Sequence, residues 1–111
     1  MGMRQNVKMI FKADKDEAKE KAIYIYSHWD GDEGDSPLMK KVRNAIARRQ
    51  RWDDASYLGR IIFSEIIKDD IGGERGYGLS TEQTDPNYAD IVIDMERQTV
   101  DDVGFEDFIK E

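Results

Sequence analysis

The chain has 111 residues, of which 39% are hydrophobic and 37% are charged, and its net charge at pH 7 is -7. This length predicts one domain over residues 1–111, and no apolar run approaches the roughly 18 residues of a membrane span. The absence of cysteine excludes disulfides and thiolate metal sites, and the single histidine, His28, excludes a two-histidine site within one chain. We expect a cytoplasmic protein without a signal peptide, a metal or a cofactor.

The charge is distributed unevenly along the chain. Residues 1–55 carry 12 basic and 10 acidic side chains, whereas residues 56–111 carry 5 basic and 14 acidic ones, a sum of -9. A segment with this excess of acidic side chains repels nucleic acid and attracts basic surfaces. Solubility alone would also explain it.

Two strands are predicted at the start of the chain. Residues 6–13 place Val7, Met9 and Phe11 on one face with period two. Residues 22–29 alternate and are rich in β-branched and aromatic side chains, which favours a strand covered on both faces. The charged residues 14–21 between them read as a turn, so we expect an antiparallel pair.

Two helices follow an acidic loop at residues 30–35. Ser36 is a good N-cap and Pro37 suits the first helical position, so a helix is predicted over residues 37–50. Asp53 or Asp54 can begin a second, more apolar helix that reaches Asp69. The glycines at 72 and 73 end it, and the turn continues to residue 78.

The remaining segments predict strands. Residues 77–81 form a short one, residues 89–96 alternate as a half-buried strand, and residues 98–103 form a last strand before a weak tail element at Phe105 and Phe108. The element order is ββααβββ. It predicts an α+β fold with two helices packed on one face of a mainly antiparallel sheet.

The densest polar and aromatic cluster lies at residues 26–32, where a strand enters a loop. Neighbouring strand residues point to opposite faces, so Ser27 and His28 cannot form a nucleophile and base pair, and we assign no catalytic residue. Gly34 and Lys41 stand where an EF-hand loop needs ligands, which argues against calcium. If this strand end meets the glycine-rich loop at 73–78, the candidate ligand or partner residues are Ser27, His28, Trp29, Asp30, Arg75 and Tyr77.

A basic segment runs from Lys40 to Arg51 and holds six basic residues and no acidic one. On a helix it could lie against a phosphate backbone or an acidic protein. The chain's own acidic half could also neutralise it, and we favour this interpretation. The aromatic residues Trp29 and Trp52 stand beside charged loops, a position that suits either a binding hot spot or the edge of a core.

Residues 23–31, Ile-Tyr-Ile-Tyr-Ser-His-Trp-Asp-Gly, resemble a pattern in small uncharacterised phage and prophage proteins. Residues 51–54, 60–65 and 76–78 resemble the same group, so that the resemblance extends over residues 22–96. It implies a viral accessory protein that works in bacterial cytoplasm. No established activity or catalytic residue comes with it.

Three functions remain open. The first is non-catalytic binding of a protein partner, such as a host factor that the protein inhibits. The second is a small-ligand binder or enzyme that uses Ser27–Asp30 and the loop at 73–78. The third is nucleic-acid binding through residues 40–51, against which the overall charge argues. An exposed sheet edge could also support a homodimer.

Overall fold

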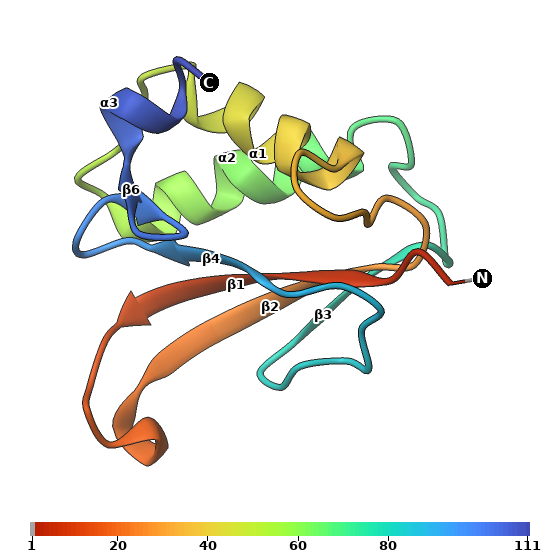
Figure 1. Cartoon of the computed structure of the whole chain (residues 1–111), viewed down its shortest axis with the longest axis horizontal. Helices are drawn as coiled ribbons and strands as arrows, with labels where there is room; N and C mark the ends of the chain where they lie inside the picture. The colour runs from red at the N-terminus through yellow and green to blue at the C-terminus, as the bar shows by residue number, and fades with distance from the viewer. Residues whose placement is uncertain (1) are drawn as a thin grey trace.

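The chain folds into a six-stranded mixed sheet with two helices on one of its faces (Figure 1). The structure is a computed structural model, and it describes residues 2–111. The elements are β1 (Gln5–Lys12), a 3-10 turn (Glu17–Lys19), β2 (Lys21–Ser27), α1 (Pro37–Ile46), α2 (Ala55–Ile67), β3 (Tyr77–Ser80), β4 (Ile91–Asp94), β5 (Thr99–Val100), β6 (Val103–Gly104) and α3 (Phe105–Phe108). The predicted α+β class is confirmed, although the chain has one strand and one helix more than the predicted order.

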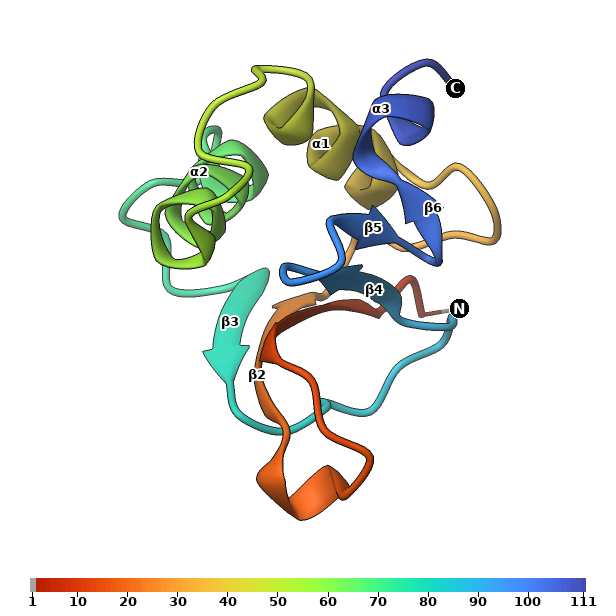
Figure 2. The same cartoon turned by 90° about the vertical axis from the view of Figure 1, so that its left-hand side faces the viewer.

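The sheet has the strand order β3-β2-β1-β4-β5-β6, so β3 forms one edge and β6 the other (Figure 2). The pair β1 and β2 is antiparallel as expected, with Val7 opposite Ile25. Within residues 2–111, only β1 and β4 run parallel, and every other neighbouring pair of strands is antiparallel. Because β3 and β4 lie on opposite sides of the hairpin, residues 81–90 must cross from one to the other.

The first helix is shorter than its sequence predicts. Ser36 Oγ accepts a hydrogen bond from Met39 N at 3.0 Å, which confirms the N-cap. The helix ends at Ile46, so the prediction that it reaches residue 50 is wrong. The indole of Trp52 donates a hydrogen bond to Ile46 O at 2.9 Å and so satisfies one of the last carbonyls of the helix. The backbone of Arg49, with φ of 56°, has left the helical conformation.

The end of the chain also differs from the prediction. Residues 98–103 are not one strand, because Asp101 and Asp102 adopt φ of 48° and 68° and turn the chain between β5 and β6. The element at the end of the chain is better formed than predicted, because Phe105 and Phe108 lie in the helix α3 and are buried in the core. Short polar side chains tolerate the left-handed conformation, and the alternating pattern alone did not reveal this turn.

One hydrophobic cluster lies between the helices and the sheet. Its members include Val7, Met9, Ile25, Leu38, Val42, Ile46, Leu58, Ile62, Ile66, Ile91, Ile93, Phe105 and Phe108. The even-numbered residues of β1 point to the opposite face, which no helix covers (Figure 1). Within residues 2–111, none of the helices has the length and apolar character needed to cross a membrane.

Candidate functional site at the end of the sheet

The structure brings together the two segments that carry the predicted site residues. In the β2–β3 pair, Ser27 lies opposite Tyr77, and the backbone N–H of His28 donates to Gly76 O at 2.8 Å. Residues 27–30 and 75–77 therefore share one end of the sheet. The spatial condition for a common site is met, because β3 returns along β2 after the two helices.

A cluster of hydrogen-bonded polar side chains lies beneath this end of the sheet. Lys41 Nζ is 2.8 Å from Asp30 Oδ2, 2.8 Å from the Tyr77 hydroxyl and 3.2 Å from Ile66 O. The Tyr77 hydroxyl also donates to Asp30. The three side chains satisfy one another and fasten α1 to both strand ends.

The electrostatics of this cluster favour a charged lysine and a neutral tyrosine. Burial lowers the pKa of Lys41, but hydrogen bonds to Asp30 and Tyr77 outweigh it, so the pKa lies above its ordinary value. Burial, followed by the hydrogen bond to Asp30, raises the pKa of Tyr77. Neither group is shifted toward the neutral pH at which a general base works, so the cluster has the character of a structural support.

Trp29 packs against Tyr77 of this cluster and is 46% exposed. Its Nε1 donates to the Tyr77 hydroxyl at 3.3 Å, and the two rings meet edge to face with centroids 5.9 Å apart. Gly76 has φ of 91°, and a Cβ at this position would collide with the indole. The glycine thus allows a large exposed side chain to be held in one orientation.

His28 lies on the sheet face away from the helices, as the alternation predicts. Its Nδ1 is 2.8 Å from the Tyr26 hydroxyl, and both residues line a shallow hollow of about 430 Å³ together with Trp29, Arg75 and Gly76. Ser27 points the other way, is fully buried and accepts a hydrogen bond from Asp30 N at 3.1 Å. Ser27 therefore shapes the loop rather than the hollow.

Sequence reasoning missed Lys41 as part of the site. The sequence analysis places Lys41 in the basic segment and names no individual partner for it. A signal was present, because Lys41 follows Leu38 by three residues and precedes Ala45 by four, so it lies along the buried stripe of α1. A lysine on that stripe needs a carboxylate partner, and Asp30 supplies it.

The other basic residues of the segment are largely neutralised within the chain. Ion pairs join Arg43 to Asp35 and Glu111, Arg48 to Glu65, Arg49 to Glu106, and Arg51 to Asp54. Three of these carboxylates belong to the acidic second half, at residues 65, 106 and 111. Self-neutralisation therefore accounts for most of the basic segment, and little of it remains available to a phosphate backbone.

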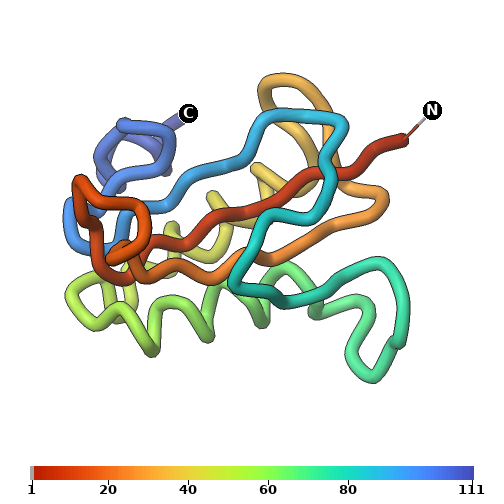
Figure 3. Tube along the Cα trace, turned by 90° about the horizontal axis from the view of Figure 1, so that it is seen from below, coloured from red at the N-terminus to blue at the C-terminus, as the bar shows by residue number. Residues whose placement is uncertain are grey.

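Exposed apolar side chains gather on one side of the molecule. Among residues 2–111, six large hydrophobic side chains are exposed, and all but Met3 come from β2, β3, α2 or the loops beside them. Figures 2 and 3 both show α2 and β3 on the same side of the molecule. We name this set the β3-edge surface; it consists of Ile23, Trp29, Tyr57, Ile71 and Leu79.

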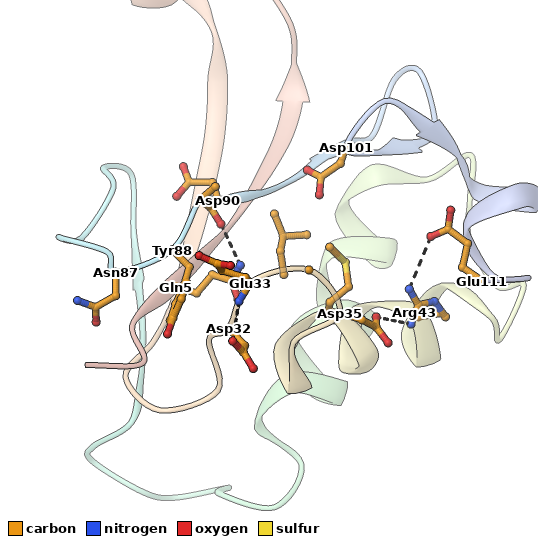
Figure 4. A pocket seen from close by; sticks show the side chains of 14 residues that line it. Gln5, Asp32, Glu33, Asp35, Arg43, Asn87, Tyr88, Asp90, Asp101 and Glu111 are labelled. Carbon is orange, nitrogen blue, oxygen red and sulfur yellow. Dashed lines mark hydrogen bonds and ion pairs between the residues drawn. The ribbon is translucent and has the colours of Figure 1, made fainter. Parts of the chain in front are cut away.

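A larger hollow, of about 780 Å³, lies elsewhere, between the acidic loop 32–35, α1 and the start of β4 (Figure 4). Its carboxylates are Asp32, Glu33, Asp35, Asp90, Asp101 and Glu111. Arg43 is the one basic residue of its lining and pairs with two of them. Burial raises the pKa of Asp101, with Asp102 and Asp90 adding to the shift. The sequence predicted the excess of acid but not this groove.

The described part of the chain, residues 2–111, contains no group of three or more histidine, aspartate or glutamate side chains placed to hold a metal ion. Comparison with known proteins gives no relative: no family model, no curated protein and no solved structure matches this chain.

Proposed function

We propose that the protein binds another protein without catalysis, and that the β3-edge surface is where it does so. The observation that carries the proposal is the exposure of Trp29 in a fixed orientation. A large exposed ring that is already immobilised loses little entropy on binding, and tryptophan is among the residues that dominate interface energies. The resemblance to phage proteins supports a partner in bacterial cytoplasm, such as a host factor.

The rest of the surface fits this role. Leu79 is 57% exposed and Ile71 is 78% exposed, although a chain with this many charged residues has ample polar side chains to cover itself. Exposed apolar surface that exceeds single scattered side chains typically marks a contact site, and five such side chains come from elements on one side of the molecule. Of the charged groups that share a hollow with Trp29, Asp30 and Lys41 are paired with each other, while Asp69, Asp70 and Arg75 form no ion pair within residues 2–111.

The small-ligand alternative is weaker. The hollow beside His28 and Arg75 is shallow and open, whereas ligand sites usually enclose most of their ligand. In the best-connected polar cluster of this end, Lys41 uses all three of its donors within the chain, on Asp30, Ile66 O and Tyr77. The hydrogen bonds from Lys41 and Tyr77 both end at Asp30 Oδ2, which leaves Asp30 Oδ1 as the carboxylate oxygen without a hydrogen bond within residues 2–111.

The proposal can be tested by affinity capture from bacterial lysate, with the chain itself included as soluble prey. We expect a saturable protein ligand whose capture falls about tenfold or more for Trp29→Ala, in line with an interface hot spot. Leu79→Glu should abolish capture. Met3→Glu is the matched control, because it introduces the same charge at the exposed apolar residue outside the surface.

Circular dichroism and a thermal melt of each variant separate lost binding from lost folding. Equal capture by Leu79→Glu and Met3→Glu would place the contact outside the β3-edge surface. A complete lack of saturable capture, by lysate proteins or by the chain itself, would refute protein binding.

A further inference from the structure

We propose that the partner at the β3-edge surface is a second copy of this chain, which pairs through β3 in an antiparallel manner about a two-fold axis. The inference rests on the proposed function and specifies its partner. It begins from the position of β3 as the last strand of the sheet, where it pairs with β2 on one side only. The outer backbone N–H and C=O groups of such a strand are a template for another strand.

The edge lacks the charged residues, proline and bulge that commonly protect a strand from pairing. Proteins commonly guard an edge with lysine, proline or a bulge. Residues 76–81, Gly-Tyr-Gly-Leu-Ser-Thr, contain no charge and no proline, in a chain of which 37% is charged. At the other edge, by contrast, β6 follows Asp101 and Asp102 and precedes Glu106 and Asp107. The residues directly next to β3 are thus uncharged, and the nearest charges in the sequence are Arg75 and Glu82.

A short strand alone would not hold two copies together. A stable interface buries about 800 Å² on each partner, more than four residues supply. The exposed apolar side chains of the β3-edge surface would have to supply the remainder. Leu79 lies opposite Ile25, which is buried under the helices, so Leu79 points to the helix side of the sheet. Pairing of two edges would bring the Leu79 side chains and the neighbouring α2 helices of both copies together.

The charges that flank β3 are complementary to themselves under a two-fold axis. Arg75 precedes the strand by two residues and Glu82 follows it by two. Within residues 2–111 neither forms an ion pair, although six of the eight arginines do. Antiparallel pairing brings each Arg75 toward Glu82 of the other copy. An interface between identical surfaces requires this kind of self-complementarity.

Sedimentation equilibrium over a range of protein concentrations tests the inference. We expect the unmodified chain to show a reversible monomer–dimer equilibrium, and Leu79→Glu to remain a monomer. Arg75→Glu and Glu82→Arg should each weaken association about tenfold or more. Either change places like charges at residues 75 and 82 of opposite copies, and the two-fold axis repeats this repulsion at a second place. The double variant Arg75→Glu/Glu82→Arg should restore it, which a merely structural effect of either residue would not do. Met3→Glu should associate like the unmodified chain.

The failure of this inference differs from the failure of the proposed function. If the chain stays monomeric at every concentration, the second copy is the wrong partner, while capture of a lysate protein that depends on Leu79 still supports the proposed function. A dimer that persists in Leu79→Glu, or one that the double charge exchange does not restore, would overturn the β3 pairing.

Discussion

Lys41 Nζ lies 2.8 Å from Asp30 Oδ2, and this ion pair joins α1 to the turn that follows β2. Its side chains are only 22% and 14% exposed, so each would lose its compensation if the other were removed. We expect Lys41→Met to lower the free energy of unfolding by about 1–3 kcal/mol, less than for a fully buried pair because solvent screens part of the interaction. Urea denaturation measures this change.

Lys40→Met is the matched control for that experiment. Lys40 is exposed, belongs to the same helix and forms no ion pair within residues 2–111. It should change the free energy of unfolding by no more than about 0.5 kcal/mol. Equal losses in both variants would mean that the ion pair contributes nothing beyond the general effect of a lost charge.

Gly76 holds Trp29 in place by the absence of a side chain. We expect Gly76→Ala to destabilise the protein by about 1–3 kcal/mol, because the new Cβ meets both an unfavourable φ and the indole. Gly72→Ala isolates the first effect, since Gly72 has φ of 84° and nothing within 4 Å of an added Cβ. Thermal unfolding of both variants gives the comparison.

The double variant Trp29→Ala/Gly76→Ala separates the two contributions directly. Without the indole, the cost of the alanine at position 76 should fall to that of Gly72→Ala. If the cost stays the same in the presence and absence of Trp29, the contact between the two residues is not what the glycine serves.

Local patterns predicted the elements whose signals are contained within a few residues. Alternation located β1 and β2, and Ser36 with Pro37 located the start of α1. At the end of α1, Ile46 O accepts hydrogen bonds from Arg49 N and from the indole of Trp52, and no helix pattern contains that information. The parallel pairing of β1 with β4 likewise depends on contacts between distant segments.

The sequence predicted several residues of the site, but not the contacts between them. An aromatic strand end and a glycine-rich loop suggested Trp29 and Tyr77, and the structure brings them together. The role of Lys41 was hidden because a charge on a helix is usually solvated. Its position along the apolar stripe would have indicated a buried partner, although not that the partner is Asp30.

Glu65 is a carboxylate on the buried side of α2, with a side chain only 5% exposed. Its oxygens lie 2.7 Å from Arg48 and 2.6 Å from Lys68. The close ion pair with Lys68, and then the hydrogen bond from Arg48, lower the pKa of Glu65 despite its burial. We expect Glu65→Gln to lower the free energy of unfolding by about 1–3 kcal/mol at neutral pH, because it removes a buried charge with two partners. The loss is limited because both cations are partly exposed and solvent screens the interaction.

The pH dependence gives a sharper test of Glu65. A carboxyl group whose folded pKa is depressed contributes stability that is complete above its ordinary pKa of about 4.3. This contribution is lost as the pH falls through the lower, folded value. The difference in stability between the unmodified chain and Glu65→Gln should therefore shrink below about pH 4.3. Glu74→Gln, at an exposed residue, is the matched control for the loss of one carboxylate.

Tyr77 should be recognisable by its late ionisation. The chain has five tyrosines, and burial with the hydrogen bond to Asp30 raises the pKa of Tyr77. The absorbance of tyrosinate, followed as the pH rises, should show a component above the ordinary value of about 10. Tyr77→Phe should remove that component, whereas Tyr57→Phe should leave it in place.

The same shift links Tyr77 to stability at alkaline pH. Because its folded pKa is raised, the neutral hydroxyl contributes stability that is complete below the unfolded pKa of about 10 and is lost as the pH rises through the folded value. The pKa of Lys41 is also raised, so its contribution disappears in the same direction. Tyr77→Phe should thus be less stable than the unmodified chain at neutral pH and should approach it in strong alkali. If the two denaturation midpoints stay equally far apart as the pH rises, the hydroxyl is not held neutral by Asp30.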